Sequence, residues 1–223
     1  MVTESATLLA TNLGGFEAAC TITLAGAPES PRKLSGQILG HGGKIFLEAA
    51  PAKSKTAAAA GFGVIWDATS RRGFVFSEAL QGYAAFEESV RFTNFLMEAV
   101  AGQPETMEGH PVDYADVTAT RSDGNKNVLH LAQAKDLGNL PLQIRSDNGA
   151  DSFVLVLSKV KAIAPAEAMF LPPIGFTRYP SELALVNELA DRQRMVLGGH
   201  GHAGTLQNPE ESIEPRHSPG MVQ

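Results

Sequence analysis

The chain has 223 residues, of which 43% are hydrophobic, enough to build one sizeable core and to predict a single domain. Its formal net charge of -6 and its pI of about 5.5 leave no basic surface for a phosphate backbone, so nucleic acid is not an expected partner. The single cysteine excludes an intramolecular disulfide, and the absence of a run of about 18 apolar residues predicts no transmembrane segment.

The domain organisation follows from where apolar residues stop. Residues 1 to 13 are interpreted as an N-terminal extension, residues 14 to 197 as one domain, and residues 198 to 223 as a disordered tail, because Gly, Pro, His, Glu and Ser replace apolar residues there. The first residues lack the basic start and apolar run of a secretory signal. We therefore expect a cytoplasmic protein, or a periplasmic or cell-envelope protein whose signal has been removed.

Alternation of apolar and polar residues dominates the first part of the domain and predicts strands. Residues 16 to 24 place Cys20 on the apolar side, where we expect it to be a small buried side chain. Residues 34 to 39 and 44 to 49 also read as strands, and the glycine-rich residues 40 to 43 between them favour a hairpin. Residues 49 to 60 are ambiguous between a loop and a short helix.

The next two predicted strands, residues 62 to 67 and 73 to 80, are apolar on both faces. Strands of this kind are covered from two sides, so another element has to lie over them. Residues 85 to 101 are the best candidate, because apolar residues recur there at helical spacing and Glu87 and Glu88 precede them. We expect a helix over residues 85 to 101 that covers the sheet.

The second half repeats the strand pattern. Residues 112 to 121 and 127 to 134 flank a Ser-Asp-Gly-Asn turn, which is a strong hairpin signal. Two more strands are predicted at residues 140 to 145 and 152 to 163, followed by an amphipathic helix at about residues 181 to 197. The expected fold class is α+β: an antiparallel half-open β-barrel covered by helices, with a disordered C-terminal tail.

Three segments carry a resemblance to a known family: EGHPVDYADVTATRSDG (108 to 124), DLGNLPLQIRSDN (136 to 148) and APAEAMFLPPIGFTRY (164 to 179). Their order resembles the LolA-like superfold of bacterial lipoprotein-localisation carriers and related periplasmic lipid-binding domains, over roughly residues 14 to 180. The resemblance implies a half-open barrel whose concave side, under helices, receives acyl chains in the carrier members.

The candidate ligand-binding residues come from the strands at 62 to 67 and 73 to 80 and from the predicted helix. Aromatic side chains alternate in phase along each strand, so we expect the two sets to form one wall that faces the helix. The predicted ligand-binding residues are Phe62, Val64, Trp66, Phe74, Phe76, Phe92, Phe95 and Leu96. A closed core uses the same residue types, so a filled core remains an alternative.

The expected function is a non-enzymatic binding domain that shelters a lipid acyl chain or another apolar ligand in a concave cavity. The alternative is a structural or protein-interaction module with a filled core and no ligand. Expected partners are an apolar ligand or lipoprotein acyl chain, and an envelope protein.

No catalytic residue, cofactor or metal site is predicted. His41-Gly42-Gly43 resembles an oxyanion-hole loop, but no Gly-x-Ser-x-Gly nucleophile motif accompanies it. The tail histidines His200, His202 and His217 are interpreted as incidental.

Overall fold

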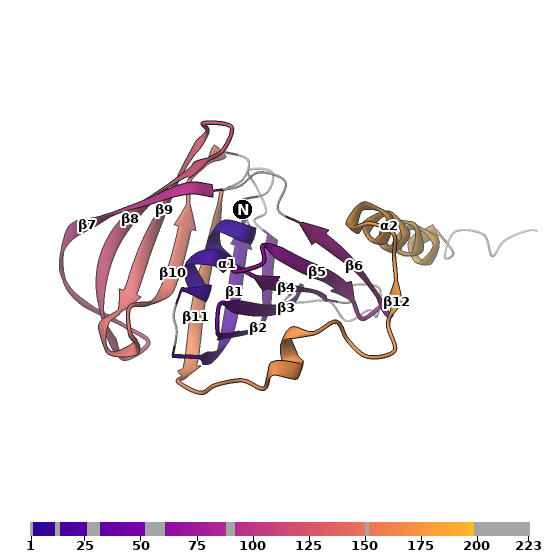
Figure 1. Cartoon of the computed structure of the whole chain (residues 1–223), viewed down its shortest axis with the longest axis horizontal. Coiled ribbons are helices and arrows are strands. Elements are labelled where there is room, and N and C mark those ends of the chain that lie inside the picture. The colour runs from indigo at the N-terminus through magenta and orange to yellow at the C-terminus, as the bar shows by residue number, and fades with distance from the viewer. Residues whose placement is uncertain are drawn as a thin grey trace, which may run out of the picture.

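The computed structural model describes residues 2–11, 14–25, 32–51, 61–87, 92–149 and 152–198. These residues form one curved sheet of 12 strands, with helix α1 (Val2–Ala10) lying across it and helix α2 (Glu182–Gly198) at one end (Figure 1). The strands are β1 (Phe16–Leu24), β2 (Arg32–His41), β3 (Lys44–Pro51), β4 (Phe62–Asp67), β5 (Arg72–Ser77), β6 (Gly82–Glu87), β7 (Phe92–Met107), β8 (His110–Arg121), β9 (Lys126–Ala134), β10 (Leu140–Ser146), β11 (Phe153–Lys161) and β12 (Thr177–Arg178). The short 3-10 helices η2 (Lys135–Leu137) and η4 (Glu167–Phe170) lie between strands in the second half.

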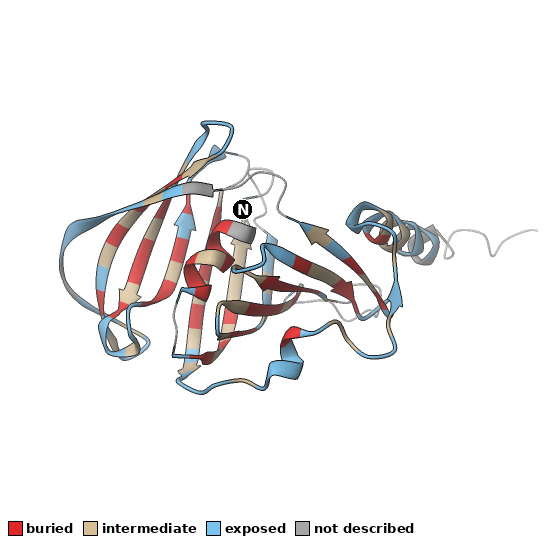
Figure 2. Ribbon diagram, in the orientation of Figure 1, coloured by how far each residue is buried: buried red, intermediate tan, exposed pale blue. Residues whose placement is uncertain are grey.

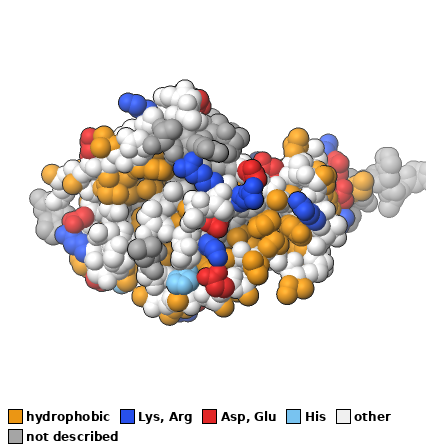
Figure 3. Space-filling model, viewed as in Figure 1, with side chains coloured by type: hydrophobic (Ala, Val, Ile, Leu, Met, Phe, Trp, Pro, Cys, Tyr) orange, Lys and Arg blue, Asp and Glu red, His pale blue; other side chains and the backbone are white. Residues whose placement is uncertain are grey.

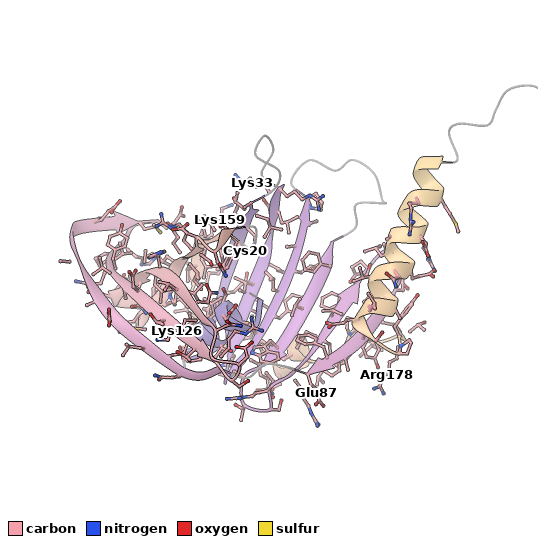
Figure 4. All side chains as sticks on the ribbon, turned by 90° about the horizontal axis from the view of Figure 1, so that it is seen from above. Cys20, Lys33, Glu87, Lys126, Lys159 and Arg178 are labelled. Atoms are coloured by element: carbon pink, nitrogen blue, oxygen red, sulfur yellow. The ribbon has the colours of Figure 1, made fainter. Side chains whose placement is uncertain are left out.

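The strand order is β12-β6-β5-β4-β3-β2-β1-β11-β10-β9-β8-β7. Each strand pairs antiparallel with its neighbour, except that β12 runs parallel to β6. Strand β1 pairs with both β2 and β11, so it joins the N-terminal and C-terminal halves of the sheet. The sheet stays open, and from above β7 and helix α2 lie at opposite ends of its curve (Figure 4).

The predicted hairpins occur where the sequence places glycine. Gly42 and Gly43 adopt φ angles of 57° and 81° between β2 and β3, a left-handed conformation that side chains with a Cβ rarely adopt. Gly124 has a φ of 84° between β8 and β9. Both predicted turns are confirmed.

The predicted helix over residues 85 to 101 is wrong. Residues 85 to 87 belong to β6 and residues 92 to 101 to β7, and residues 88 to 91 lie outside the described residues. The pairing of β7 with β8 runs from Phe92 opposite Arg121 to Met107 opposite His110. Strand β7 is an edge strand with exposed apolar side chains on both faces, at Leu96 and Met97. With apolar residues on both faces, apolar and polar residues do not alternate along β7, and the spacing of the apolar residues resembles that of an amphipathic helix.

Both faces of β4 and β5 are covered, as predicted, but by other elements. Helix α1 lies on the concave face and contacts β2, β3, β4 and β10, and its residues are largely buried (Figure 2). Helix α2 places Leu185 against Ala84 of β6. On the opposite face, Phe170 of η4 packs into a cluster with Phe46 and Phe76.

An ion pair also fastens η4 to the sheet. The Nζ of Lys44 donates a hydrogen bond of 2.7 Å to a carboxylate oxygen of Glu167. This hydrogen bond holds the pKa of Glu167 below its ordinary value and raises the pKa of Lys44. The segment between β11 and β12 therefore has a second contact with β3 besides the packing of Phe170.

Helix α1 lies within residues 1 to 13, the segment interpreted as an N-terminal extension. Leu9 of α1 is 1% exposed and belongs to the main hydrophobic cluster, so the predicted extension at residues 1 to 13 contains a core helix. The predicted helix at the C-terminus is confirmed as α2. Most of the ambiguous segment at 49 to 60, and the predicted tail beyond Gly198, lie outside the described residues.

Cys20 is buried in this core, as predicted. No helix within the described ranges is long and apolar enough to cross a membrane.

Candidate apolar binding site

A cavity of about 190 Å³ lies between helix α1 and the concave face of the sheet. Its walls come from α1 on one side and from β1, β2, β3, β4 and β11 on the other. The lining residues are Ser5, Ala6, Leu9, Ile22, Leu24, Leu34, Ile38, Ile45, Leu47, Phe62, Val64, Trp66, Phe153 and Leu155. None of these residues carries a charge.

The register of the strands brings these side chains together. Residues directly opposite each other in an antiparallel pair point to the same face of the sheet. Ile38 is opposite Leu47, and Leu47 is opposite Val64, so the three form one row across β2, β3 and β4. A second row places Ile45 opposite Trp66.

The cavity has an exposed end and a buried end along strand β4. The side chain of Phe62 is 39% exposed, whereas Trp66 is 1% exposed. Four residues along a strand span about 13 Å. The cavity therefore extends from an exposed end beside Phe62 towards a buried end at Trp66.

Two of the lining residues carry buried polar atoms. Ser5 Oγ and Trp66 Nε1 are buried, and neither has a hydrogen-bond partner in the part of the chain that the structure describes. The Trp66 ring stacks on Phe86 with centroids 5.7 Å apart and ring planes 12° apart. Because the indole N–H lies in the ring plane, this nearly parallel stacking does not direct it at the face of Phe86.

Three of the predicted ligand-binding residues, Phe62, Val64 and Trp66, line this cavity. On the face seen in Figure 3, hydrophobic side chains gather over the region of β4 to β6. The remaining lining residues were not predicted, and they come from α1, β1, β2, β3 and β11. Alternation along residues 16 to 24 was a usable signal for Ile22 and Leu24, which share a face with Cys20.

Phe74 and Phe76 lie on the opposite face of the sheet, so the expected single aromatic wall does not form. The turn between β4 and β5 places Trp66 opposite Gly73, and the neighbouring Phe74 therefore points away from the cavity. Phe76 stacks on Phe46 at 5.7 Å and meets Phe176 edge to face at 6.3 Å. Both predicted residues belong to the cluster beneath η4.

The predicted residues Phe95 and Leu96 of strand β7 do not line this cavity. Strands β8, β9 and β10 separate β7 from β11 in the sheet. Phe95 is partly buried against the main core, and Leu96 is 52% exposed. The side chain of Phe92 lies outside the described residues.

Charged side chains gather on the face opposite the cavity, along β8, β9 and β10. His130 Nδ1 lies 2.7 Å from Asp116 Oδ1, and Arg145 Nη2 lies 3.1 Å from Asp147 Oδ2. Among the described residues there is no group of three or more His, Cys, Asp or Glu side chains placed to hold a metal ion. His130 Nε2 also lies 3.5 Å from Asp147 Oδ2, so these four side chains form one linked set of polar contacts at the surface.

No family model matches this chain, and no curated protein matches it. Among solved structures, PNGF-II in a C2 space group has a TM-score of 0.46 and 13% identity, with 81% of this chain and 33% of that chain covered. This chain thus spans about a third of the length of PNGF-II.

Two shorter proteins match over nearly their whole length. A LolA superfamily protein from Nitrosomonas europaea has a TM-score of 0.42 and 12% identity, with 76% of this chain and 96% of that chain covered. A DUF1329 family protein from Desulfovibrio piger has a TM-score of 0.37 and 11% identity, with 76% and 95% covered. A LolA superfamily protein is thus among the matched solved structures, at a TM-score below 0.5.

Proposed function

We propose that this chain is a non-enzymatic binding domain that shelters an apolar ligand, such as a lipid acyl chain, between helix α1 and the concave face of the sheet. The observation that supports this proposal most directly is the cavity itself. It has no charged side chain among its described lining residues, and it connects an exposed Phe62 to a buried Trp66. A concave, mostly apolar pocket with a few polar groups is the usual form of a small-molecule site.

Burial of hydrocarbon would supply the binding free energy. Each methylene group transferred from water to an apolar cavity contributes about 0.8 kcal/mol, so six of them contribute about 5 kcal/mol. No directional chemistry is required for this contribution. The proposed site is accordingly a carrier site without a catalytic step.

The volume of the cavity limits what it receives. At about 190 Å³ it exceeds an engineered apolar cavity of roughly 150 Å³ that binds benzene, but it is smaller than drug-sized pockets of about 300 to 1,000 Å³. A ring or a short chain fits the space beneath α1, and a long acyl chain requires α1 to move.

The partners and location belong to the same proposal. A lipoprotein acyl chain is the natural ligand by resemblance to the LolA-like carriers, and an envelope protein would deliver or receive it. This assignment places the protein in the periplasm or cell envelope.

A filled-core interaction module is the second candidate function, favoured by the burial of α1. Leu9 is 1% exposed and occupies the concave face, where a ligand would otherwise lie. In this case α1 is a permanent part of the core, and no ligand enters.

Two variants at adjacent positions separate these functions. Leu34 lines the cavity, whereas Lys33 is exposed and precedes it on the other face of β2. Native mass spectrometry of the wild-type protein from cells should show a bound lipid, Leu34→Trp should lose it, and Lys33→Trp should retain it. Wild-type protein free of any ligand, with no uptake of a fluorescent lipid analogue, would support the filled-core module.

A further inference from the structure

We propose that a polar pocket beside the first turn of helix α1 binds a phosphate group, carried by a lipid headgroup or by a small phosphate monoester. This pocket has a volume of about 310 Å³ and shares no described lining residue with the apolar cavity. It lies between α1, the hairpin of β8 and β9, and the end of β10. The lining residues are Glu4, Arg121, Asn125, Lys126, Asn127, Ser146 and Asn148.

Two cations on the hairpin give the pocket its positive charge. Lys126, at the start of β9 (Figure 4), is exposed, and its Nζ has no ion pair or hydrogen bond within the part of the chain that the structure describes. The side chain of Arg121 is 37% exposed, and its contact with Asp123 spans 3.8 Å, which is longer than a hydrogen bond. Both cations are therefore open to a ligand that enters from solvent.

Side-chain amides accompany these cations. Asn125, Asn127 and Asn148 line the same pocket, and each amide group carries two N–H donors. The Nδ2 of Asn127 donates a hydrogen bond of 3.2 Å to Glu4 Oε1, and its Oδ1 accepts one of 3.4 Å from Ser146 Oγ. A ligand therefore meets an amide that is already ordered, which lowers the entropic cost of binding.

A phosphate group matches this set of side chains. It offers several strong acceptor oxygens, and Arg binds them as a planar fork while Lys binds them as a point charge. Glu4 is the one acidic residue among the described lining residues, and it is only 2% exposed. It thus lies deeper in the pocket than the two cations that an entering anion meets first.

The pocket adjoins the apolar cavity along two elements. On α1, Glu4 lines the pocket and the next residue, Ser5, lines the cavity. Across β10 and β11, Ser146 lines the pocket and its directly opposite partner Phe153 lines the cavity. The phosphate therefore has two sources, a lipid whose chain occupies the cavity or a free monoester, and only the lipid source rests on the proposed function.

The test is calorimetric titration of the wild-type protein with glycerol phosphate, hexanoyl glycerol phosphate and uncharged hexanoyl glycerol. We expect hexanoyl glycerol phosphate to bind at least tenfold more tightly than hexanoyl glycerol, because hydrogen bonds to charged groups are the stronger ones. If glycerol phosphate binds as tightly as its hexanoyl derivative, the source is a free monoester. A gain of tenfold or more from the hexanoyl chain identifies a lipid.

Two variants with the same change of net charge complete the test. Lys126→Gln should weaken the binding of the phosphate ligands roughly tenfold and leave that of hexanoyl glycerol unchanged. Lys33 is exposed and does not line the pocket, so Lys33→Gln should bind all three ligands as the wild type does.

Three results overturn the inference. The first is hexanoyl glycerol phosphate that binds no more tightly than hexanoyl glycerol, together with no binding of glycerol phosphate. The others are unchanged phosphate binding by Lys126→Gln and an equal loss of binding by Lys33→Gln. In each case the binding of hexanoyl glycerol reports separately on the proposed function, because that ligand carries no phosphate.

Discussion

Cys20 shows how burial changes the chemistry of a single side chain. It is 3% exposed, and desolvation raises the pKa of its thiol to about 11. The thiolate is the reactive form of cysteine. We expect a thiol reagent such as Ellman's reagent to label the native protein at pH 8 much more slowly than the protein unfolded in guanidinium, and equal rates would contradict the burial.

The same shift predicts the direction of a pH dependence. The thiol keeps its proton more tightly in the folded protein than in the unfolded chain, where its pKa is about 9. The free energy of unfolding therefore does not depend on this thiol below pH 9, and it falls as the pH rises from 9 to 11, because the unfolded chain loses the proton first. Cys20→Ala should lose stability less steeply than the wild type across this range, as measured by urea unfolding.

Phe62 and Phe76 are a matched pair on opposite faces of the sheet. Phe76 is 2% exposed beneath η4, and Phe62 is 39% exposed at the rim of the cavity. Phe76→Ala should cost about 3 to 5 kcal/mol of stability and leave the affinity for an apolar probe unchanged. Phe62→Ala should cost less stability and weaken probe binding, and the reverse pattern would contradict the assignment of the two faces.

At the scale of elements, strand β7 is the sharpest difference between prediction and structure. Alternate N–H groups of an edge strand point to its neighbour, and the others point to solvent. Amide hydrogen exchange along residues 94 to 100 should therefore alternate between slow and fast. Uniform protection of these amides would indicate a helix.

Local patterns were sufficient for most of the strands. Alternation predicted β1, and glycine between apolar runs predicted the hairpin at Gly42 and Gly43. In β7 the pattern was insufficient, because an edge strand with apolar residues on both faces has no period of two. The partner strand β8, which follows in the sequence, decides the structure of β7.

The candidate site was predicted in part, for a related reason. In-phase residues of one strand do share a face, which is why Phe62, Val64 and Trp66 were placed correctly together. The register between two strands decides whether their aromatic side chains point to the same face of the sheet. Because Trp66 is opposite Gly73, the next residue, Phe74, points to the face away from the cavity. Helix α1 contributes lining residues because it packs on the sheet, and the periodicity of apolar residues in the sequence does not show which elements pack together.

At the scale of the whole molecule, the open sheet and helix α1 act together. A curved sheet with its edges apart leaves an apolar concave face that has to be covered. Helix α1 covers its centre, and helix α2 covers β5 and β6 at one end. The cavity lies between α1 and the sheet, so the position of α1 controls its volume.

The central claim, that this cavity receives an apolar ligand, is tested most directly by titrating the wild-type protein with a small, uncharged fluorescent apolar probe. The emission of Trp66, the one tryptophan of the chain, reports from the buried end of the cavity. We expect saturable binding of one probe per chain and a change in tryptophan emission that follows the same curve. Probe uptake that rises linearly without saturation, with unchanged tryptophan emission at concentrations below probe aggregation, would contradict the claim.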